Sequence, residues 1–192
     1  VEPHTTTVEV GDEFIVDIYV NSVENLYTWQ IKLYYNESVF TCLEAWLPSD
    51  NVFAYSIPLI PPPMIEGNYT LVGATLMGSE WPFTGCGTLC KIRFRALESG
   101  NCTLLFDDVD TFLLTSSMKS MDFKPVNGFA EACLPDFNND GIVDSTDIAL
   151  IARAFGMRQG DQGWNPVFDI NRDSKINMID IAKTARAYGG SS

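Results

Sequence analysis

The stretch DFNNDGIVDSTD, residues 136–147, places oxygen-bearing side chains at its positions 1, 3, 5, 9 and 12 and a glycine at position 6. Residues 169–180, DINRDSKINMID, place Asp or Asn at the same five positions. Calcium is a hard cation that binds six to eight oxygen atoms, and twelve-residue loops with this spacing wrap such a shell. The spacing therefore predicts two bound Ca²⁺ ions, one in each loop.

The backbone carbonyl of position 7 completes each predicted ligand set. The first loop offers Asp136, Asn138, Asp140, the Ile142 carbonyl, Asp144 and Asp147. The second loop offers Asp169, Asn171, Asp173, the Lys175 carbonyl, Asn177 and Asp180. Position 12 is Asp, which reaches less far than the Glu of an EF-hand, and Ser174 replaces the glycine that suits a sharp turn. We expect the second loop to bind calcium more weakly.

Each loop continues into a segment with helical periodicity. Ten of 21 positions are identical between residues 136–156 and residues 169–189, so the segment is a duplicated loop–helix unit. We expect the helices to end near Gly156 and Gly189. The expected apolar stripes consist of Ile148, Ile151, Ala152 and Phe155 in the first helix and of Ile181, Thr184, Ala185 and Tyr188 in the second. Asp- and Asn-rich loops also favour turns and helix N-caps without metal, but two loops in register favour calcium.

The first 130 residues alternate between apolar and polar side chains, as strands do. Phe14, Val16, Ile18 and Val20 share one face of the first such stretch, and CKIRFRAL (residues 90–97) shows the same alternation. We predict a mostly β chain in which residues 1–130 form an antiparallel jelly-roll or Greek-key sandwich. Residues 131–135 are then a short hinge, and residues 136–192 are a small α domain with two calcium-binding repeats.

Composition favours a secreted protein and argues against a nucleic-acid partner. The net charge is −13, whereas a nucleic-acid-binding surface is basic. The sequence begins at Val1 without Met, as a processed secreted chain would, and contains no apolar stretch long enough to span a membrane. We therefore expect an extracellular or cell-surface location. In such a protein the five cysteines predict one or two disulfides and an odd thiol: Cys42, Cys86, Cys90, Cys102 and Cys133.

Two segments resemble known families. Residues 136–189 resemble a type I dockerin, because each repeat has a DxNxDGxVxxxD-like loop followed by one helix. Residues 8–130 resemble a cohesin module, through VEVGDEFIVDIYV (8–20), LYTWQIKLYYNESVFTCLEA (26–45) and GTLCKIRFRAL (87–97). Cohesins are jelly-roll sandwiches that hold dockerins. The resemblance thus implies that one chain carries both a docking domain and a module that binds such domains; we call the binding surface of that module the socket.

The resemblance also implies which dockerin residues contact a partner. Family members dock chiefly through loop positions 10 and 11 and through outward residues of the helices. The corresponding partner-binding residues here are Ser145, Thr146, Arg153, Met178, Ile179 and Arg186. The two repeats therefore present different surfaces, polar in the first and apolar in the second.

The leading functional hypothesis is a secreted calcium-binding structural or adhesion protein that assembles head to tail. A hinge of five residues spans less than about 20 Å, which disfavours docking of a chain onto itself. Docking onto another copy is heterologous and gives a ring or a filament. One alternative is a cellulosome-like scaffold adaptor that docks a different partner. Another is a carbohydrate-binding module with a dockerin tag.

Two further features bear on function. Three N-x-S/T sequences predict N-glycans on Asn36, Asn68 and Asn101. His4 is the only histidine, and no Ser/His/Asp or Cys/His constellation can be assembled around it, so we do not expect an enzyme.

Overall fold

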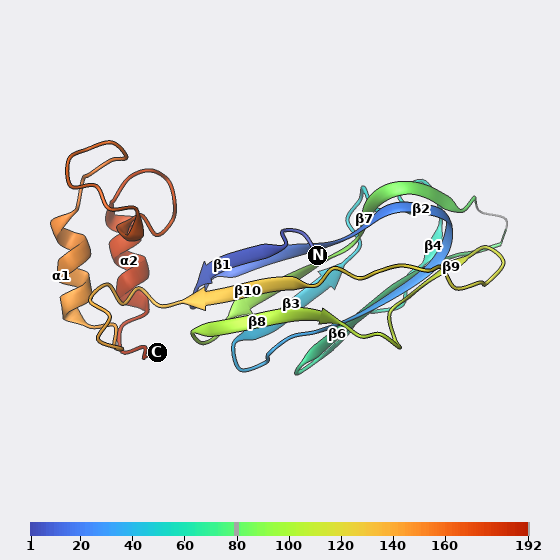
Figure 1. Ribbon diagram of the computed structural model, residues 1–192, viewed down its shortest axis with the longest axis horizontal. Coiled ribbons are helices and arrows are strands. Elements are labelled where there is room, and N and C mark those ends of the chain that lie inside the picture. Colours follow the sequence, from blue (N-terminus) through green and yellow to red (C-terminus); the bar gives the residue numbers. More distant parts are fainter. Residues whose placement is uncertain (79–80, 192) are drawn as a thin grey trace. The chain divides into compact units, whose positions relative to one another are not determined.

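A computed structural model describes residues 1–78 and 81–191 of the chain, which divides into two compact units. The sandwich unit comprises Val1–Val8 and Asp12–Ala132. The C-terminal unit comprises Glu9–Gly11 and Cys133–Ser192. Strands dominate the first unit, and α1 and α2 lie in the second (Figure 1). The predicted fold, a mostly β sandwich followed by two helical repeats, is confirmed.

The structure assigns the following elements to the described residues. The strands are β1 (Thr5–Glu9), β2 (Glu13–Tyr34), β3 (Phe40–Trp46), β4 (Pro58–Leu59), β5 (Met64–Glu66), β6 (Tyr69–Leu76), β7 (Phe83–Ala96), β8 (Gly100–Phe106), β9 (Phe112–Thr115) and β10 (Gly128–Cys133). The helices are α1 (Ser145–Arg153), the short 3₁₀ helix η1 (Pro166–Phe168) and α2 (Met178–Arg186).

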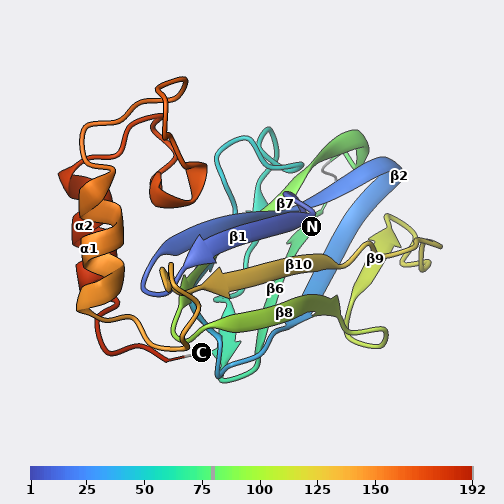
Figure 2. The ribbon, with the colours of Figure 1, turned by 60° about the vertical axis from the view of Figure 1, so that its left-hand side comes forward.

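Strand β2 joins the two layers of the sandwich, as its curve in Figure 2 shows. Its first half pairs with β7, which in turn pairs with β3, whereas its second half pairs with β6 and β9. The register shifts three times between Ile18 and Leu26, and both Ser22 and Asn25 have a positive φ there. Such bulges bend a strand and increase its twist, so one strand of 22 residues replaces the two separate strands that the sequence suggests.

The core of the sandwich lies between these layers and follows the alternation in the sequence. Trp29, Ile31 and Leu33 of β2 are at most 4% exposed, and the apolar residues of β7 from Cys90 to Ala96 are equally buried. Both strands therefore turn the face predicted from their sequence inward. The charged residues of β7 lie on the outer face, where Lys91 and Arg93 pair with Asp17 and Glu44.

The C-terminal unit has a small core of its own. Ile151, Ala154 and Ile176 are buried at its centre. Partly buried side chains surround them: Phe137, Met157, Trp164, Phe168, Ile170 and Ile181. Because this core contains few large apolar residues, it supplies little of the stability that a folded unit needs.

The side of each helix that faces this core differs in part from the side predicted by the apolar stripes. From Ser145 to Phe155, the buried residues of the first repeat are Asp147, Ile151 and Ala154, whereas Ala152 and Phe155 are exposed. The second repeat does the same, since its buried helical residues are Asp180 and Thr184. Each helix is rotated because its third residue, an Asp, points back into the preceding loop.

Truncation of the buried helix residue tests this core. We expect Ile151→Ala to destabilise the C-terminal unit by about 2–5 kcal/mol, because a fully buried side chain leaves a cavity. Phe155→Ala, four residues along, should change stability little, since Phe155 is 56% exposed. The full chain is denatured in the presence of calcium, and hydrogen exchange of the helical amides reports the unfolding of the C-terminal unit in each variant. Equal losses for the two variants would contradict this assignment of the buried side.

The structure contradicts the predicted disulfides, because none of the five cysteines is in one. Cys42, Cys90 and Cys102 are buried in the sandwich unit, where each acts as a small apolar side chain. Burial raises the pKa of the Cys42 and Cys102 thiols, so they remain protonated.

Candidate calcium loops and docking surfaces

The two candidate loops share one backbone conformation. Position 4 has a positive φ in both, 56° at Asn139 and 57° at Arg172. Position 6 also has a positive φ, 89° at Gly141 and 68° at Ser174. The second loop thus forms the same sharp turn without glycine, and a side chain in this region costs about 1–2 kcal/mol.

Side chains fold back onto the loop in the same way in both repeats. Asp136 Oδ2 accepts a hydrogen bond from Gly141 N at 2.8 Å, and Asp169 Oδ2 accepts one from Ser174 N at 2.9 Å. The side-chain amide at position 3 donates to the carboxylate at position 5, at 2.7 Å in the first loop and 3.1 Å in the second. Positions 1, 3 and 5 therefore lie on the concave side of each loop.

The carboxylate at position 12 closes each loop. Asp147 is 0% exposed and accepts hydrogen bonds from Phe137 N at 2.7 Å and from Asp144 N at 2.9 Å. Asp180 is also 0% exposed and accepts from Asn171 N at 3.2 Å and from Asn177 N at 2.8 Å. Position 12 thus holds the beginning and the end of the loop together.

Positions 9 and 12 also cap the helices. Asp144 and Asn177 are the N-cap residues of α1 and α2, and each forms a capping box with the Asp at position 12. The Thr146 N–H donates to Asp144 and holds the pKa of that carboxyl below its usual value. Capping and metal binding are compatible, because an ionised carboxylate has about four lone-pair sites.

The ligand sets fit calcium in chemistry and charge. Every predicted ligand atom is an oxygen, and the carboxylates number four in the first loop and three in the second. Neither Asp147 nor Asp180 forms an ion pair with Lys or Arg in the described part of the chain, although both are fully buried. A buried carboxylate is costly without a compensating cation, which a bound divalent ion would supply.

Carboxylates alone do not form the site. In residues 1–78 and 81–191, no three His, Cys, Asp or Glu side chains converge closely enough to hold a metal ion by themselves. A calcium site here would therefore also need the predicted asparagine and backbone oxygens, from positions 3 and 7 in both loops and from position 9 in the second.

The two repeats are interlocked through position 8. Val143 of the first loop exchanges backbone hydrogen bonds with the segment after α2, from Val143 N to Gly190 O at 2.9 Å and from Gly189 N to Val143 O at 2.8 Å. Ile176 of the second loop is bonded in the same way to the segment after α1, including Gly156 N to Ile176 O at 2.8 Å. Both position 8 side chains are fully buried. Each loop is therefore held by the end of the other repeat.

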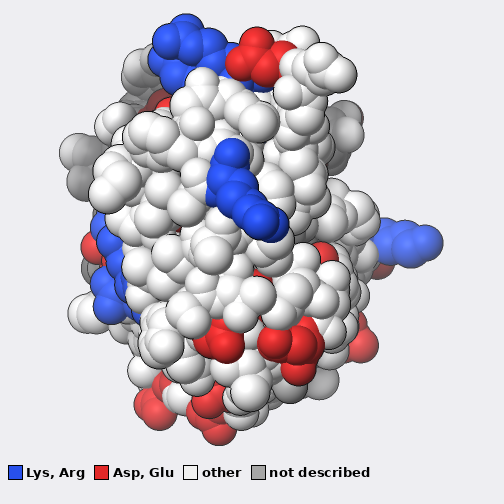
Figure 3. Space-filling model, turned by 90° about the vertical axis from the view of Figure 1, so that its left-hand side faces the viewer, with Lys and Arg blue, Asp and Glu red and all other residues white. Residues whose placement is uncertain are grey.

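All six residues that the sequence assigns to docking are exposed. Met178 is 65% exposed and Ile179 is 54% exposed. The others are Ser145, Thr146, Arg153 and Arg186. Phe155 and Tyr188, which the sequence analysis placed in the apolar stripes, are exposed as well. Figure 3 looks at the side that carries α1 and α2 in Figure 1: much of this surface is uncharged, basic side chains stand at its centre and along its upper edge and sides, and acidic side chains lie mainly toward its lower edge.

The sandwich unit also has an outer face of mixed aromatic, apolar and polar side chains that the sequence did not identify. It is formed where β2 pairs with β6 and β9, and its residues are only half-buried. We call it the β2–β6–β9 face; its members are Thr28, Gln30, Lys32, Tyr34, Tyr69, Leu71, Thr75, Phe112 and Leu114. The sequence signal for it was the alternation of β2, whose other side fills the core.

Lys32 on this face is surrounded by two carboxylates and a tyrosine ring. Lys32 Nζ lies 2.7 Å from Asp110 Oδ2 and 3.9 Å from an oxygen of Asp107, and it sits 4.8 Å from the Tyr69 ring centroid. The hydrogen bond to Asp110 is the main reason that the pKa of Lys32 is raised. The acidic cluster at the end of β8 thus has an ammonium partner.

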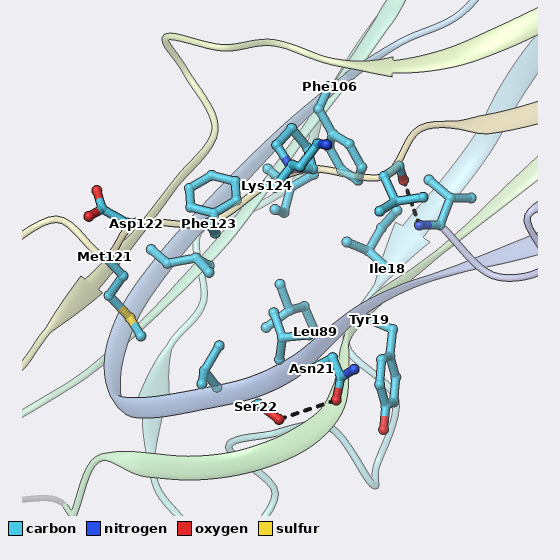
Figure 4. A pocket seen from close by; sticks show the side chains of 17 residues that line it. Ile18, Tyr19, Asn21, Ser22, Leu89, Phe106, Met121, Asp122, Phe123 and Lys124 are labelled. Carbon is cyan, nitrogen blue, oxygen red and sulfur yellow. Dashed lines mark hydrogen bonds between the residues drawn. The ribbon is translucent and has the colours of Figure 1, made fainter.

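A cavity of about 300 Å³ opens within the sandwich unit, between β2 and the segment 121–126 (Figure 4). Its floor consists of core residues such as Ile18, Leu89 and Phe106, and charged groups lie at its rim, including Asp122 and Lys124. Its lining has no histidine and no paired carboxylates. Its titratable side chains are Tyr19, Asp122 and Lys124, and no second carboxylate or histidine accompanies them in the lining.

Comparison with known proteins agrees with this division into units. Residues 134–187 match the family model of the dockerin type I domain. The sandwich agrees in fold with solved cohesin structures. The chain thus carries a cohesin-like module and a dockerin. Type I dockerins are generally calcium-binding domains, and both families are binding modules rather than enzymes.

Three solved structures illustrate the cohesin likeness. A non-cellulosomal cohesin from the archaeon Archaeoglobus fulgidus matches with a TM-score of 0.55 and 16% identity, over 70% of this chain and 90% of that one. A cohesin from Clostridium acetobutylicum matches with a TM-score of 0.55 and 16% identity, over 67% of this chain and 86% of that one. A cohesin from Acetivibrio cellulolyticus, solved in complex with a dockerin, matches with a TM-score of 0.56 and 11% identity, over 67% of this chain and 94% of that one.

At these identities the structural matches show the fold alone. No curated protein matches the chain. No helix in the described residues is long and apolar enough to cross a membrane.

Proposed function

We propose that the protein is a secreted, calcium-dependent connector whose dockerin docks on the cohesin-like module of another copy, so that chains assemble head to tail. The observation that carries this proposal is the presence of both folds in one chain. A dockerin and a cohesin are complementary partners in the solved complexes. Since the contact is heterologous, repeated docking produces a filament unless the rotation closes a ring.

The short connection between the modules favours docking between chains. Strand β10 ends at Cys133 and the first loop begins at Asp136, so two residues connect them. Three Cα–Cα steps extend over about 11 Å at most. This reach is short relative to a sandwich in which β7 alone is 14 residues long. A dockerin on so short a connection reaches a second chain more readily than a distant face of its own module.

Charge complementarity supports the same partner. Residues 1–132 carry 17 acidic and 6 basic residues, a net charge of −11, and residues 133–192 carry 8 acidic and 6 basic, a net charge of −2. Two bound Ca²⁺ ions add four positive charges and bring the dockerin to about +2. Opposite charges raise the rate of encounter between the two surfaces.

The β2–β6–β9 face is the best candidate for the socket. It offers Tyr34, Tyr69, Leu71 and Phe112 as half-buried aromatic and apolar groups on the flat side of a sheet. The dockerin offers exposed apolar side chains in return, so docking would remove apolar surface of both modules from water.

Size-exclusion chromatography of the pure chain tests the proposal. We expect calcium-dependent polymers that dissociate to monomers when a chelator removes the metal. A calcium-loaded monomer would exclude self-assembly and favour the adaptor, which docks a different partner. Binding of glycans by residues 1–132 alone would favour the carbohydrate-binding module.

Two substitutions test the two surfaces separately. We expect Ile179→Asp in the dockerin or Leu71→Asp in the β2–β6–β9 face to weaken association at least tenfold, because each places a charge in an apolar contact. Ile15→Asp is the matched control, since Ile15 is 43% exposed and lies in the half of β2 that pairs with β7. Sedimentation in calcium measures all three. Equal association of Leu71→Asp and Ile15→Asp would exclude this socket.

A further inference from the structure

Three N-x-S/T sequences that are far apart in the chain converge at one end of the sandwich unit. Asn36 follows the end of β2, Asn68 precedes β6, and Asn101 lies at the start of β8. Tyr35 N donates a hydrogen bond to Asn68 O at 2.9 Å, which joins the first site to the second. Asn36 N donates to Cys102 Sγ at 3.0 Å, and this cysteine is the middle residue of the third site. The fold therefore brings all three together.

The first two sites approach each other at Gly67. A Cβ on Gly67 would lie 2.0 Å from an oxygen of Glu37, so the Glu37 side chain lies directly over the turn that carries Asn68. Glu37 is the middle residue of the first N-x-S/T sequence. The two turns thus form one continuous surface.

The three asparagines are exposed, among them Asn36. Its Oδ1 accepts a hydrogen bond from Ser38 N at 3.1 Å, an Asx-turn in an exposed segment. Its Nδ2 donates no hydrogen bond within residues 1–78 and 81–191. That nitrogen is the atom that N-glycosylation modifies.

We propose that this end of the sandwich unit is a single carbohydrate-bearing surface, with N-linked oligosaccharides on Asn36, Asn68 and Asn101. The donor would be a lipid-linked oligosaccharide phosphate, used by a transferase of the producing cell. The asparagine Nδ2 forms a bond to the anomeric carbon of the sugar, and the bond from that carbon to the phosphate oxygen breaks. The lipid phosphate leaves with the electron pair, and Nδ2 loses one proton.

The third residue of each site sets the order of modification. The sequence requirement for Ser or Thr means that the transferase must reach this hydroxyl. Ser38 and Thr103 are exposed, whereas Thr70 is 0% exposed. Asn36 and Asn101 therefore remain acceptors on the folded unit, and Asn68 is an acceptor only before β6 is folded. We expect occupancy to be higher at Asn36 and Asn101 than at Asn68.

Glycans at this end would also limit docking, an extension that depends on the proposed function. Tyr34 and Tyr69 pair at the end of the β2–β6–β9 face that borders the modified surface. A bulky, solvated oligosaccharide there would obstruct the Tyr34 and Tyr69 end of the proposed socket.

Mass spectrometry of peptides from the native protein, isolated from its own cells, tests the proposal. We expect an oligosaccharide mass on the Asn36 peptide and none on the peptide with Asn21, which is exposed in the same unit but lacks the sequence requirement. Production of Asn36→Gln in the same cells should remove one oligosaccharide, whereas Asn21→Gln should remove none. An unmodified Asn36 in the native protein would overturn the proposal. Because the masses are measured on digested chains, failure of docking would leave this result unchanged.

Discussion

Removal of calcium with a chelator is expected to unfold the C-terminal unit and to leave the sandwich unit folded. The small core around Ile151 and Ile176 supplies little stability, and Asp147 and Asp180 are buried carboxylates without a Lys or Arg partner in the described residues. Each calcium ion contributes about 4 kcal/mol when its free concentration is 1,000 times its dissociation constant. Two ions thus contribute about 8 kcal/mol, as much as a unit of this size has in total.

Hydrogen exchange of the full chain measures this effect in each unit separately. We expect amides of α1 and α2 to lose protection in chelator, while those of β2 and β7 keep it and serve as the internal control. The backbone bonds of Val143 and Ile176 interlock the repeats, so both helices should lose protection in one transition. Unchanged protection of α1 and α2 after chelation would falsify the structural role of calcium. Recovery of this protection when calcium is added back would show that the chelator has not damaged the protein irreversibly.

Much of the fold follows directly from local patterns in the sequence. A period of two identified the buried face of β2 and β7, because side chains of a strand alternate between core and solvent. The loops were predictable for a related reason. The predicted ligands of each loop all lie within twelve residues, so their spacing alone suffices to predict a ligand set.

Features that depend on distant contacts were not predictable in the same way. The apolar stripe predicted for the first helix included Phe155, but this residue is 56% exposed. The helix is rotated so that Asp147 points into the loop, and this turns Phe155 toward solvent. Periodicity measures only apolar residues and therefore missed a buried carboxylate. The cysteines were misjudged for a similar reason, since composition does not say that Cys42 and Cys90 are packed in the core.

The β2–β6–β9 face shows the same limit for the functional site. Its members come from three strands that are separated by up to 86 residues, from Thr28 to Leu114. Nothing in the neighbourhood of any one strand indicates that these residues share a surface. Only the pairing of β2 with β6 and β9 brings them together.

Asp147→Asn is expected to abolish tight calcium binding in the first loop and to leave the second ion in place. The carboxylate uses both oxygens to accept backbone N–H groups, from Phe137 and Asp144. An asparagine amide turns an NH₂ group toward one of these donors and removes the negative charge. The loss of charge-assisted hydrogen bonds is about 3 kcal/mol, or about 100-fold in affinity. Calorimetric titration of the full chain should detect one tightly bound ion in this variant instead of two.

The matched control is Asp161→Asn, which makes the same chemical change in the same unit. Asp161 lies outside both loops, and its carboxylate accepts from Arg158 N at 2.8 Å. This variant should retain two ions, whereas Asp180→Asn should retain one, the ion of the first loop. Because Ser174 forms its turn without glycine, that remaining ion should be the tighter of the two. Two tight ions in Asp147→Asn would mean that position 12 only caps α1 and is not a calcium ligand.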